Sequence, residues 1–324
     1  MLFRSASGLM ISSSSTPSDA IVHHPLVVLG VPAYNEIRWI EKTLRSIQSQ
    51  THADFRVLIS DNASTDGTSE VCERFAQCDP RFLHFRHPEN RGASVNFSFA
   101  HERSSSRFFG WVGAHDLLHS DYLSRHLTAL EQSPAAVCSF TYFEWIDALD
   151  RTIRLDGDVG IAAPQRSAWL RYLWSIAIGS DLGPMHGLFR RSALPVPSAR
   201  PVAAGDLVLM TDVAYRGAFI AQSGHLYRLR DFTEGRGVEN MMRRITGRSG
   251  VAGTFDATIA AYLADFDLMH PPGTRGHRMR PLVSWLLHDR LDKRSLRVTK
   301  RLRSVAKRMH DLRAWLMPRT TDQH

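Results

Sequence analysis

Residues 26–36 of the chain read LVVLGVPAYNE, and this stretch decides the fold class. The run from Leu26 to Val31 is apolar without interruption, which predicts a strand buried on both faces, as strands inside a parallel sheet are. A polar turn follows directly, and residues 36–50 then show the apolar spacing of a helix that covers such a sheet. The apolar helical positions are Ile37, Ile40, Leu44 and Ile47.

The same alternation of strand and helix continues to about residue 143 and weakens beyond it. It predicts an α/β fold in which helices flank a mostly parallel sheet and ligands bind at the carboxyl ends of the strands. The predicted strands are residues 26–31, 55–60, 82–85, 108–112 and 137–143, and the predicted helices are residues 36–50, 66–76, 93–102 and 121–132.

The composition is that of an ordinary globular protein. Of the 324 residues, 43% are hydrophobic and 22% are charged, which excludes the charge-rich composition of a disordered chain. The three cysteines lack the spacing of a zinc site or a disulfide framework, so a reducing compartment is expected. Residues 1–24 lack the apolar segment of a signal peptide, and they are expected to form a flexible tail. No apolar run reaches the length of a transmembrane helix.

The net charge of +8 is concentrated near the C-terminus. Residues 271–324 hold 14 Lys and Arg against 4 Asp and Glu, whereas residues 1–270 hold 26 against 28. This distribution argues against a nucleic-acid partner for the main body. Residues 298–316 have the pattern of a basic amphipathic helix. Two hypotheses fit it: the helix binds an anionic membrane surface, or it docks on the rest of the chain or on a second subunit.

Three polar clusters follow directly on predicted strands. They are residues 32–36, residues 61–68 and residues 113–116, and on a parallel sheet they would lie along one edge. Carboxylates and amides at such an edge could hold a base, a ribose and a metal-bound diphosphate. The glycine fingerprint GxGxxG is absent after the first strand, which argues against a dinucleotide-binding dehydrogenase.

The ordered combination of these motifs resembles the family 2 glycosyltransferases, whose fold is GT-A. The resemblance covers roughly residues 26–235. It implies a GT-A domain at residues 25–235, with a nucleotide-sugar half at about 25–143 and an acceptor half at about 144–235, and it leaves residues 236–324 as a helical basic extension. The motifs that carry it are residues 31–36 (VPAYNE), residues 44–51, residues 61–68 (DNASTDGT), Asn90-Arg91-Gly92, Gly205-Asp206 and Arg216-Gly217.

The resemblance assigns Pro32, Tyr34 and Asp61 to the base and ribose of a nucleotide-diphosphate sugar, with Glu36 beside the same pocket. A structural interpretation exists for each of them. Pro32 and Tyr34 could merely end a strand. Residues 61–67 contain the residue types that favour a turn and a helix N-cap.

A divalent metal, Mn²⁺ or Mg²⁺, is the cofactor that the resemblance implies, held by the last carboxylate of a DxD-like run. Here that run reads Gly113-Ala114-His115-Asp116, so Asp116 alone remains as a carboxylate ligand. His115 takes the place of a carboxylate near the ribose and is expected to contact ribose or phosphate. The alternative is a histidine that contacts no ligand.

Asp206 matches the catalytic base of the family, which takes the proton of the acceptor hydroxyl as it attacks the anomeric carbon. Its alternative role is that of a helix N-cap, because a helical pattern follows it. Asp212, six residues further on, is a weaker candidate, expected on a solvated or ion-paired helix face.

Arg228 and Arg230 lie where relatives carry an Arg and a His in a loop that closes over the diphosphate. Their positive charges could offset the missing carboxylate, and a surface loop is the alternative. His225 is a further candidate ligand or a structural histidine. Residues 186–191 resemble the segment that lines the acceptor side, or they serve packing.

Together these features predict an inverting glycosyltransferase in cell-surface glycan or glycolipid biosynthesis. Its partners would be a nucleotide-diphosphate sugar and a glycan or lipid-linked acceptor, and its location would be cytoplasmic, with a peripheral position at the inner face of the membrane as a further expectation. The alternative is a catalytically silent relative that binds nucleotide or glycan as a scaffold, for which the altered DxD-like run is the sole support.

Overall fold

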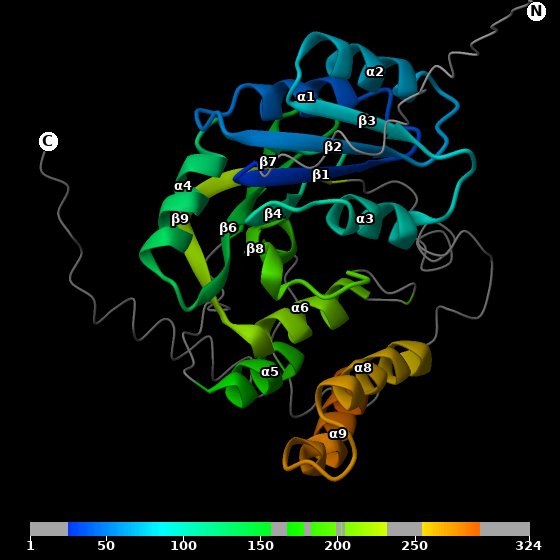
Figure 1. The fold of residues 1–324 in the computed structure, drawn as a ribbon. Helices are drawn as coiled ribbons and strands as arrows, with labels where there is room; N and C mark the ends of the chain where they lie inside the picture. The colour runs from blue at the N-terminus through cyan, green and yellow to red at the C-terminus, as the bar shows by residue number, and fades with distance from the viewer. Residues whose placement is uncertain are drawn as a thin grey trace, which may run out of the picture.

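The computed structural model describes residues 25–156, 167–177, 183–198, 202, 205–231 and 255–291. In this part of the chain nine strands form a single mixed sheet, and eight of them lie in the order β3-β2-β1-β4-β8-β6-β9-β5. The ninth strand, β7, pairs with β6 alone. Helices cover both faces of the sheet (Figure 1), which confirms the predicted α/β class.

The first four strands of the chain are parallel, as the alternating pattern predicts. Alternate residues of β1 face opposite ways: Val27 and Leu29 join the core with α1 and α2, whereas Val28 packs with α3 on the other face. A strand buried on both sides needs a continuous apolar run, which residues 26–31 provide. The elements are β1 (Val27–Ala33), α1 (Ile40–Gln48), β2 (Phe55–Asp61), α2 (Thr68–Cys78), β3 (Phe82–Arg86), α3 (Ala93–Glu102) and β4 (Phe108–Trp111).

The second half of the sheet is mixed: it keeps one parallel pair, β6 with β9, and its other described pairs are antiparallel. The strand β8 is antiparallel to both of its neighbours, β4 and β6. The long strand β9 runs parallel to β6, and β5 pairs antiparallel with its end. These elements are β5 (Leu117–Leu118), α4 (Tyr122–Gln132), β6 (Ala136–Ile146), β7 (Thr152–Leu155), β8 (Leu188–Arg190) and β9 (Ala218–Arg230).

A second core lies beyond the sheet, where four helices pack around Tyr172, Val208, Tyr262, Phe266 and Leu287. In Figure 1 two of them, α8 and α9, lie below α6 and to the right of α5, away from the sheet. None of the described helices combines the length and the apolar composition that crossing a bilayer requires. The helices are α5 (Ala168–Ala177), α6 (Gly205–Arg216), α8 (Phe255–Met269) and α9 (Arg280–Leu291), and the 3-10 turns are η1 (Gly183–His186), η2 (Arg191–Ala193) and η3 (Gly276–Met279).

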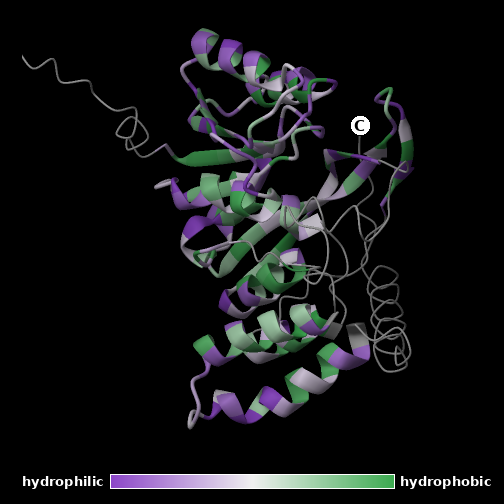
Figure 2. Cartoon of the chain, turned by 90° about the vertical axis from the view of Figure 1, so that its right-hand side faces the viewer, coloured by the Kyte–Doolittle hydropathy of each residue, from purple (hydrophilic) through white to green (hydrophobic). Residues whose placement is uncertain are grey.

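The hydropathy of the chain follows this layering. In Figure 2 the central strands are largely hydrophobic, and the helices outside them alternate hydrophobic and hydrophilic stripes. The predicted tail at residues 1–24 and the predicted basic helix at residues 298–316 lie outside the described residues. The domain boundary at residue 235 remains a prediction.

Two buried histidines make the stability of the fold depend on pH. Burial lowers the pKa of His101 to about 4 and that of His126 to about 3, from an ordinary value of 6.5. Below about pH 6.5 the unfolded chain therefore binds protons that the folded chain excludes, so the free energy of unfolding falls as the pH falls. At about pH 5 each histidine costs about 2 kcal/mol. We expect a marked drop in melting temperature between about pH 7.5 and about pH 5.

The substitution His101→Phe tests this explanation. The His101 ring makes an edge contact with Phe109, and its Nδ1 has no hydrogen-bond partner, so Phe preserves the packing and removes the titration. The variant should lose part of the pH dependence, whereas His119→Gln, at an exposed position, should keep all of it. An unchanged pH dependence in His101→Phe would contradict the assignment.

Candidate active site

The polar clusters meet beside β1, where the strand order changes direction: β2 and β3 follow on one side of β1, and β4 lies on its other side. Strand β1 lies between β2 and β4, and the chain reaches β2 and β4 by connections on opposite sides. In open α/β sheets such a reversal leaves a crevice at the carboxyl ends of the strands. The segments that follow β1, β2 and β4 are the three clusters that the sequence singled out. The expected edge is therefore present.

The turn after β1 is tied to the turn after β2 by hydrogen bonds. The backbone N–H of Asn35 donates to Ser64 Oγ at 3.0 Å, and Thr65 N donates to Asn35 Oδ1 at 2.9 Å. Asn35 adopts a φ of 55°, a left-handed conformation that Asn tolerates well. Glu36 N donates to Thr68 Oγ1 at 2.8 Å. The polar residues of this turn therefore shape the edge and hold Glu36 in place.

Asp61 is fully buried at the end of β2. Its Oδ1 accepts the backbone N–H of Ser64 at 3.0 Å. Its Oδ2 lies 3.9 Å from His84 Nε2 and 3.6 Å from Arg86 Nε, and it accepts no hydrogen bond in the structure. Burial raises the pKa of Asp61, but the interactions with His84 and Ser64 outweigh it and hold the pKa below its ordinary value. The carboxylate is therefore ionised, and its buried Oδ2 accepts no hydrogen bond in the structure.

A pair of asparagines closes the loop between β3 and α3 against the same edge. Asn62 Nδ2 donates to Asn90 Oδ1 at 2.8 Å, and Asn62 Oδ1 accepts the N–H of Arg91 at 2.9 Å. Asn90 Oδ1 also accepts the N–H of Gly92. The Asn-Arg-Gly motif of the sequence thus builds a loop beside Asp61.

Glu36 and His115 meet across the reversal point. The Nδ1 of His115 lies 3.1 Å from Glu36 Oε1, which joins the segment after β1 to the segment after β4. Tyr34, two residues before Glu36, has 44% of its surface exposed, and Pro32 lies within β1. The structure therefore places Pro32, Tyr34, Glu36 and His115 on the same edge as Asp61.

Asp116 is the most tightly held carboxylate of the cluster, with 1% of its surface exposed. Its Oδ2 accepts the hydroxyl of Tyr227 at 2.8 Å, and its Oδ1 accepts the backbone N–H of Arg230 at 2.9 Å. The Tyr227 oxygen in turn accepts the N–H of Gly113 at 3.0 Å. A Cβ at position 113 would overlap Asp116 Oδ2, so only glycine permits this arrangement.

The segment that carries Arg228 and Arg230 is part of β9, so the prediction of a loop there was wrong. Both edges of this segment form strand pairs, with β5 on one side and β6 on the other, and its backbone is fixed in the sheet. The two arginines are also paired. Arg228 Nη2 lies 3.0 Å from Glu144 Oε1.

Arg230 has a buried side chain that is surrounded by acceptors. Its Nε donates to the carbonyl of His115 at 2.8 Å, and its Nη1 donates to the carbonyl of Asp147 at 2.6 Å. The carboxylate of Asp150 pairs with its Nη2 and also with Lys42. Arg230 therefore braces the segment that contains His115 and Asp116.

Asp116 is the carboxylate of this edge that the sequence motif assigns to a divalent cation. Each of its oxygens accepts one protein hydrogen bond and keeps a second lone pair. Within the described ranges no three His, Cys, Asp or Glu side chains gather in a way that could hold a metal ion. This donor set does not fit an ion that protein ligands alone enclose. It fits an Mg²⁺-type ion that one carboxylate and substrate phosphates share.

Asp206 lies in the first turn of α6, a position within the helix rather than before it. The helix packs against β6 and against η1, whose last residue is His186. The His186 ring lies 4.7 Å from the Tyr227 ring, centroid to centroid. Helix α6 as a whole is thus in contact with η1, which lies beside Tyr227. Asp212 instead pairs with Arg216 at 3.1 Å, as expected of an ion-paired helix residue.

Two further sequence candidates have structural contacts. Arg190 donates to the carbonyls of Ala136 and Leu130, at 2.8 and 2.6 Å. The Nε2 of His225 lies 3.0 Å from the carbonyl oxygen of Asp156. Both side chains therefore bind backbone atoms outside the Asp116 cluster.

Sequence reasoning missed the parts played by Tyr227 and His186. Burial lowers the pKa of His186, and the charge of Asp116 opposes that change, so the two groups interact. The sequence around Tyr227 offers no local signal for its contact with Asp116. For His186 the sequence offers only an adjacent glycine, Gly187, at which a Cβ would lie 2.6 Å from the carbonyl oxygen of Ser139.

Tyr227→Phe is expected to loosen Asp116. The change removes a donor from Asp116 Oδ2 and leaves the N–H of Gly113 without its acceptor, which costs about 1–3 kcal/mol of stability. Binding of nucleoside diphosphate should weaken as well, and calorimetric titration measures it. Tyr122→Phe is the matched control, because the buried Tyr122 hydroxyl donates to the His186 carbonyl at 2.8 Å. Equal loss of nucleotide binding in both variants would contradict the role of Tyr227.

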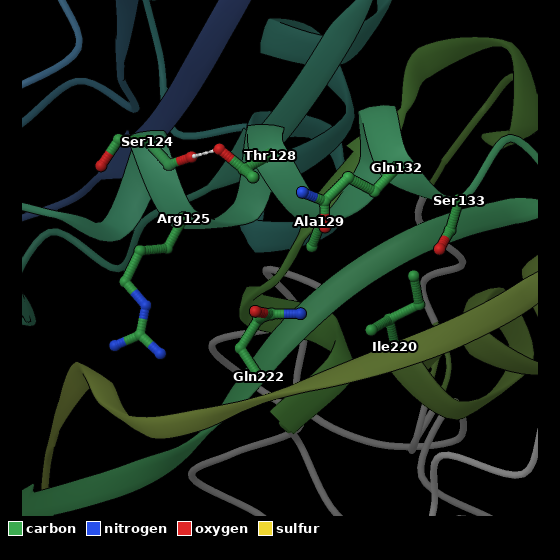
Figure 3. Close-up of a pocket in the computed structure, with 8 residues that line it drawn as sticks. All are labelled: Ser124, Arg125, Thr128, Ala129, Gln132, Ser133, Ile220 and Gln222. Atoms are coloured by element: carbon green, nitrogen blue, oxygen red, sulfur yellow. Dashed lines mark hydrogen bonds between the residues drawn. The ribbon is translucent and has the colours of Figure 1, made fainter. Parts of the chain in front are cut away.

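A separate pocket of about 340 Å³ lies between α4 and β9 (Figure 3). Its lining is mainly polar, and Arg125 is held there by the carbonyl of Ser223 at 2.7 Å. None of the residues assigned to donor, metal or base lines it. The lining residues are Ser124, Arg125, Thr128, Ala129, Gln132, Ser133, Ile220 and Gln222.

Residues 29–190, half of the chain, match the family described as Glycosyl transferase family 2. The chain belongs to this family and carries a glycosyltransferase domain. It is 30% identical over 118 residues to the Bacillus subtilis protein named "Putative teichuronic acid biosynthesis glycosyltransferase TuaG", covering 36% of this chain and 46% of that protein. It is 35% identical over 97 residues to the succinoglycan biosynthesis protein ExoA of Rhizobium meliloti, covering 29% of each. The chain thus spans less than half the length of these two relatives.

Solved structures of similar fold support the GT-A class. One is S. aureus TarS 1-349 in complex with UDP-GlcNAc, with a TM-score of 0.59 and 13% identity over 82% of this chain and 72% of that one. Another is the mannosyltransferase PcManGT from Pyrobaculum calidifontis in complex with GDP-Man and Mn²⁺, with a TM-score of 0.50 and 17% identity over 91% and 77% of the two chains. At these identities the likeness shows the fold, which is the GT-A fold that the sequence motifs implied.

Proposed function

We propose that the chain transfers a sugar, with inversion, from a nucleotide-diphosphate sugar to an acceptor hydroxyl in the synthesis of a cell-surface glycan or glycolipid. Family membership and the names of the relatives support this class of reaction. The observation that carries the proposal is the grouping of Asp61, Glu36, His115 and Asp116 at one edge of the sheet, each fixed by contacts from a neighbouring segment.

Asp61 would read the base of the donor. An ionised carboxylate with one unused oxygen accepts a hydrogen bond and cannot donate one. Uracil, thymine and guanine carry a ring N–H that could serve as the donor, and cytosine carries an exocyclic amino group that could serve as well. Asp61 alone therefore does not choose the base, and the UDP-GlcNAc and GDP-Man of the similar solved structures favour a uridine or guanosine donor. The exposed ring of Tyr34 would cover the base or the ribose.

The diphosphate would lie near Asp116 and His115. A divalent metal, Mn²⁺ or Mg²⁺, held by Asp116 would supply positive charge for the leaving diphosphate. The chain itself contributes the rigidity of this carboxylate, because Tyr227 and Arg230 fix both of its oxygens. The imidazole of His115, oriented by Glu36, would donate a hydrogen bond to ribose or phosphate.

Asp206 would act as the base. Inverting transfer needs one carboxylate that removes the proton of the acceptor hydroxyl while that oxygen attacks the anomeric carbon. The position of Asp206 in the first turn of α6, on a helix that packs against η1, supports its assignment to the acceptor side. We assign Arg228 and Arg230 to bracing the segment around Asp116, since both are paired with carboxylates.

The silent-scaffold alternative draws on the run Gly113-Ala114-His115-Asp116 alone. The geometry of that run favours the enzyme. A site without catalytic use would require neither glycine at position 113 nor two hydrogen-bond donors to Asp116. We further propose that the enzyme works in the cytoplasm at the inner face of the membrane, where a lipid-linked acceptor would be presented.

The proposal is tested by incubating the full chain with UDP-, dTDP- and GDP-sugars and simple glycoside acceptors, and by recording nucleoside diphosphate release and the anomeric configuration of the product. Release that depends on the acceptor, with inversion, is expected for one donor. Retention of configuration would overturn the inverting assignment. If a nucleotide binds and no donor is turned over with any acceptor, the scaffold alternative holds.

A further inference from the structure

Helix α9 has two apolar faces, and the described core uses only one of them. Val283, Leu286 and Leu287 are buried against α5 and α8 in the second core. On the other side Leu282 is 40% exposed and Trp285 is 50% exposed. Leu282 and Trp285 are therefore two exposed apolar side chains on the side of α9 that faces away from the second core.

Arginines border this exposed apolar face. Arg275 and Arg278 are exposed, and among the described residues no carboxylate pairs with either of them. The acidic residue nearby, Asp267, is already engaged by Arg280 at 2.8 Å. The hollow beside Trp285 has a volume of about 740 Å³ and is lined by His277, Arg278, Arg280, Pro281, Ser284, Trp285 and His288.

The four side chains lie at the start of α9 and in the segment just before it. Leu282 and Trp285, three positions apart, share one face of α9, whereas Arg278 belongs to η3 and Arg275 precedes that turn. These four residues are called the stripe. The stripe belongs to the helix pair α8 and α9, which lies on the side of α6 that is away from the sheet in Figure 1. Its four side chains are exposed.

We propose that the stripe formed by Arg275, Arg278, Leu282 and Trp285 docks the protein on an anionic lipid bilayer. Trp is favoured at the depth of the lipid headgroups because one end of its ring system is apolar and the other donates a hydrogen bond. Arginines beside it attract anionic headgroups. The surface is distinct from the basic segment at residues 298–316 that the sequence alone suggested.

Like charge argues against the other occupants of this face. Residues 292–324, which follow α9 directly, hold 10 Lys and Arg against 3 Asp and Glu, so their charge repels Arg275 and Arg278. A second copy in a two-fold contact would bring the same arginines onto the same face. An anionic partner remains, and the exposed Trp285 and Leu282 favour a bilayer over a purely polar polyanion.

Sedimentation of the full chain with phosphatidylcholine vesicles, with and without phosphatidylglycerol, tests the proposal. Wild type should bind the vesicles that contain phosphatidylglycerol. The double variant Arg275→Gln, Arg278→Gln should bind about 30-fold more weakly, because each arginine contributes about a fivefold factor near an anionic surface. Trp285→Ser should weaken binding about tenfold. The matched controls are Arg74→Gln and Leu155→Ser, which change an exposed arginine and an exposed leucine elsewhere.

Three outcomes overturn the proposal. Wild type that binds neither vesicle preparation would show that no docking occurs. Full binding by both α9 variants would show that residues 292–324 act alone, and a dimer that dissociates in Trp285→Ser would show a second copy. Nucleotide binding is measured on the same variants and should stay at the wild-type value. A failure of the membrane-docking proposal can then be distinguished from a failure of the proposed transfer reaction.

Discussion

Asp206→Asn should lower the rate of sugar transfer roughly 10²–10⁴-fold while leaving the affinity for nucleoside diphosphate unchanged. The amide cannot take the proton of the acceptor hydroxyl, but the donor residues at the ends of β1, β2 and β4 are untouched by the change. The rate is measured as acceptor-dependent release of nucleoside diphosphate, and the affinity by calorimetric titration.

Asp212→Asn is the matched control for this variant. It changes a carboxylate on the same helix and removes the ion pair with Arg216. We expect this loss to lower stability and to leave the transfer rate near that of wild type. Transfer at the wild-type rate in Asp206→Asn would refute the base assignment. A comparable loss in both variants would indicate damage to α6 instead.

Asp116→Asn is expected to remove most of the metal-dependent binding of nucleoside diphosphate and to lower transfer roughly 10²–10³-fold. The substitution takes away the negative charge that would hold a cation. It also places an amide where Oδ2 now accepts the Tyr227 hydroxyl. Binding is measured by titration with and without Mn²⁺, and transfer by product release.

Asp79→Asn provides the control for the loss of a buried carboxylate. Asp79 pairs with Arg81 at 2.7 Å, just before β3 and among none of the site residues. Its removal should cost stability and leave nucleotide binding intact. If Asp116→Asn kept the full metal-dependent affinity, the place of the diphosphate in this account would be wrong.

The parallel half of the fold could be predicted because its signals are local. The apolar run at residues 26–31 became β1, and the helical spacing of Ile40, Leu44 and Ile47 became the buried face of α1. The polar turns after β1, β2 and β4 then had to share one edge, since parallel strands carry their carboxyl ends on the same side.

The mixed half could not be predicted because its pairings are long-range. Strand β9 is fixed by β6, about 80 residues earlier in the chain, and by the two residues of β5. No local pattern distinguishes residues 227–230 from a loop with two arginines. Only the fold shows that the Arg230 side chain is buried among acceptors and that Tyr227 reaches back to Asp116.

The sequence motifs predicted which residues gather at the candidate site, but not the contacts that hold them there. Glu36, His115 and Asp116 were chosen from motifs, and the structure brings the first two into contact at 3.1 Å. Their roles toward donor and metal stay predictions. The brace that Tyr227 and Arg230 form around Asp116 depends on atoms more than 110 positions apart, so the sequence alone contains no short-range sign of it.

We expect nucleoside diphosphates to bind at the edge formed by Asp61, His115 and Asp116. The direct measurement is the shift in melting temperature of the full chain on adding UDP, dTDP, GDP or CDP, with and without Mn²⁺, in wild type and in Asp116→Ala. A ligand at 100 times its dissociation constant stabilises the fold by about 2.7 kcal/mol, which a melting curve resolves. We expect a Mn²⁺-dependent shift with at least one of these nucleotides that is lost in Asp116→Ala. No shift with any nucleotide would contradict this expectation.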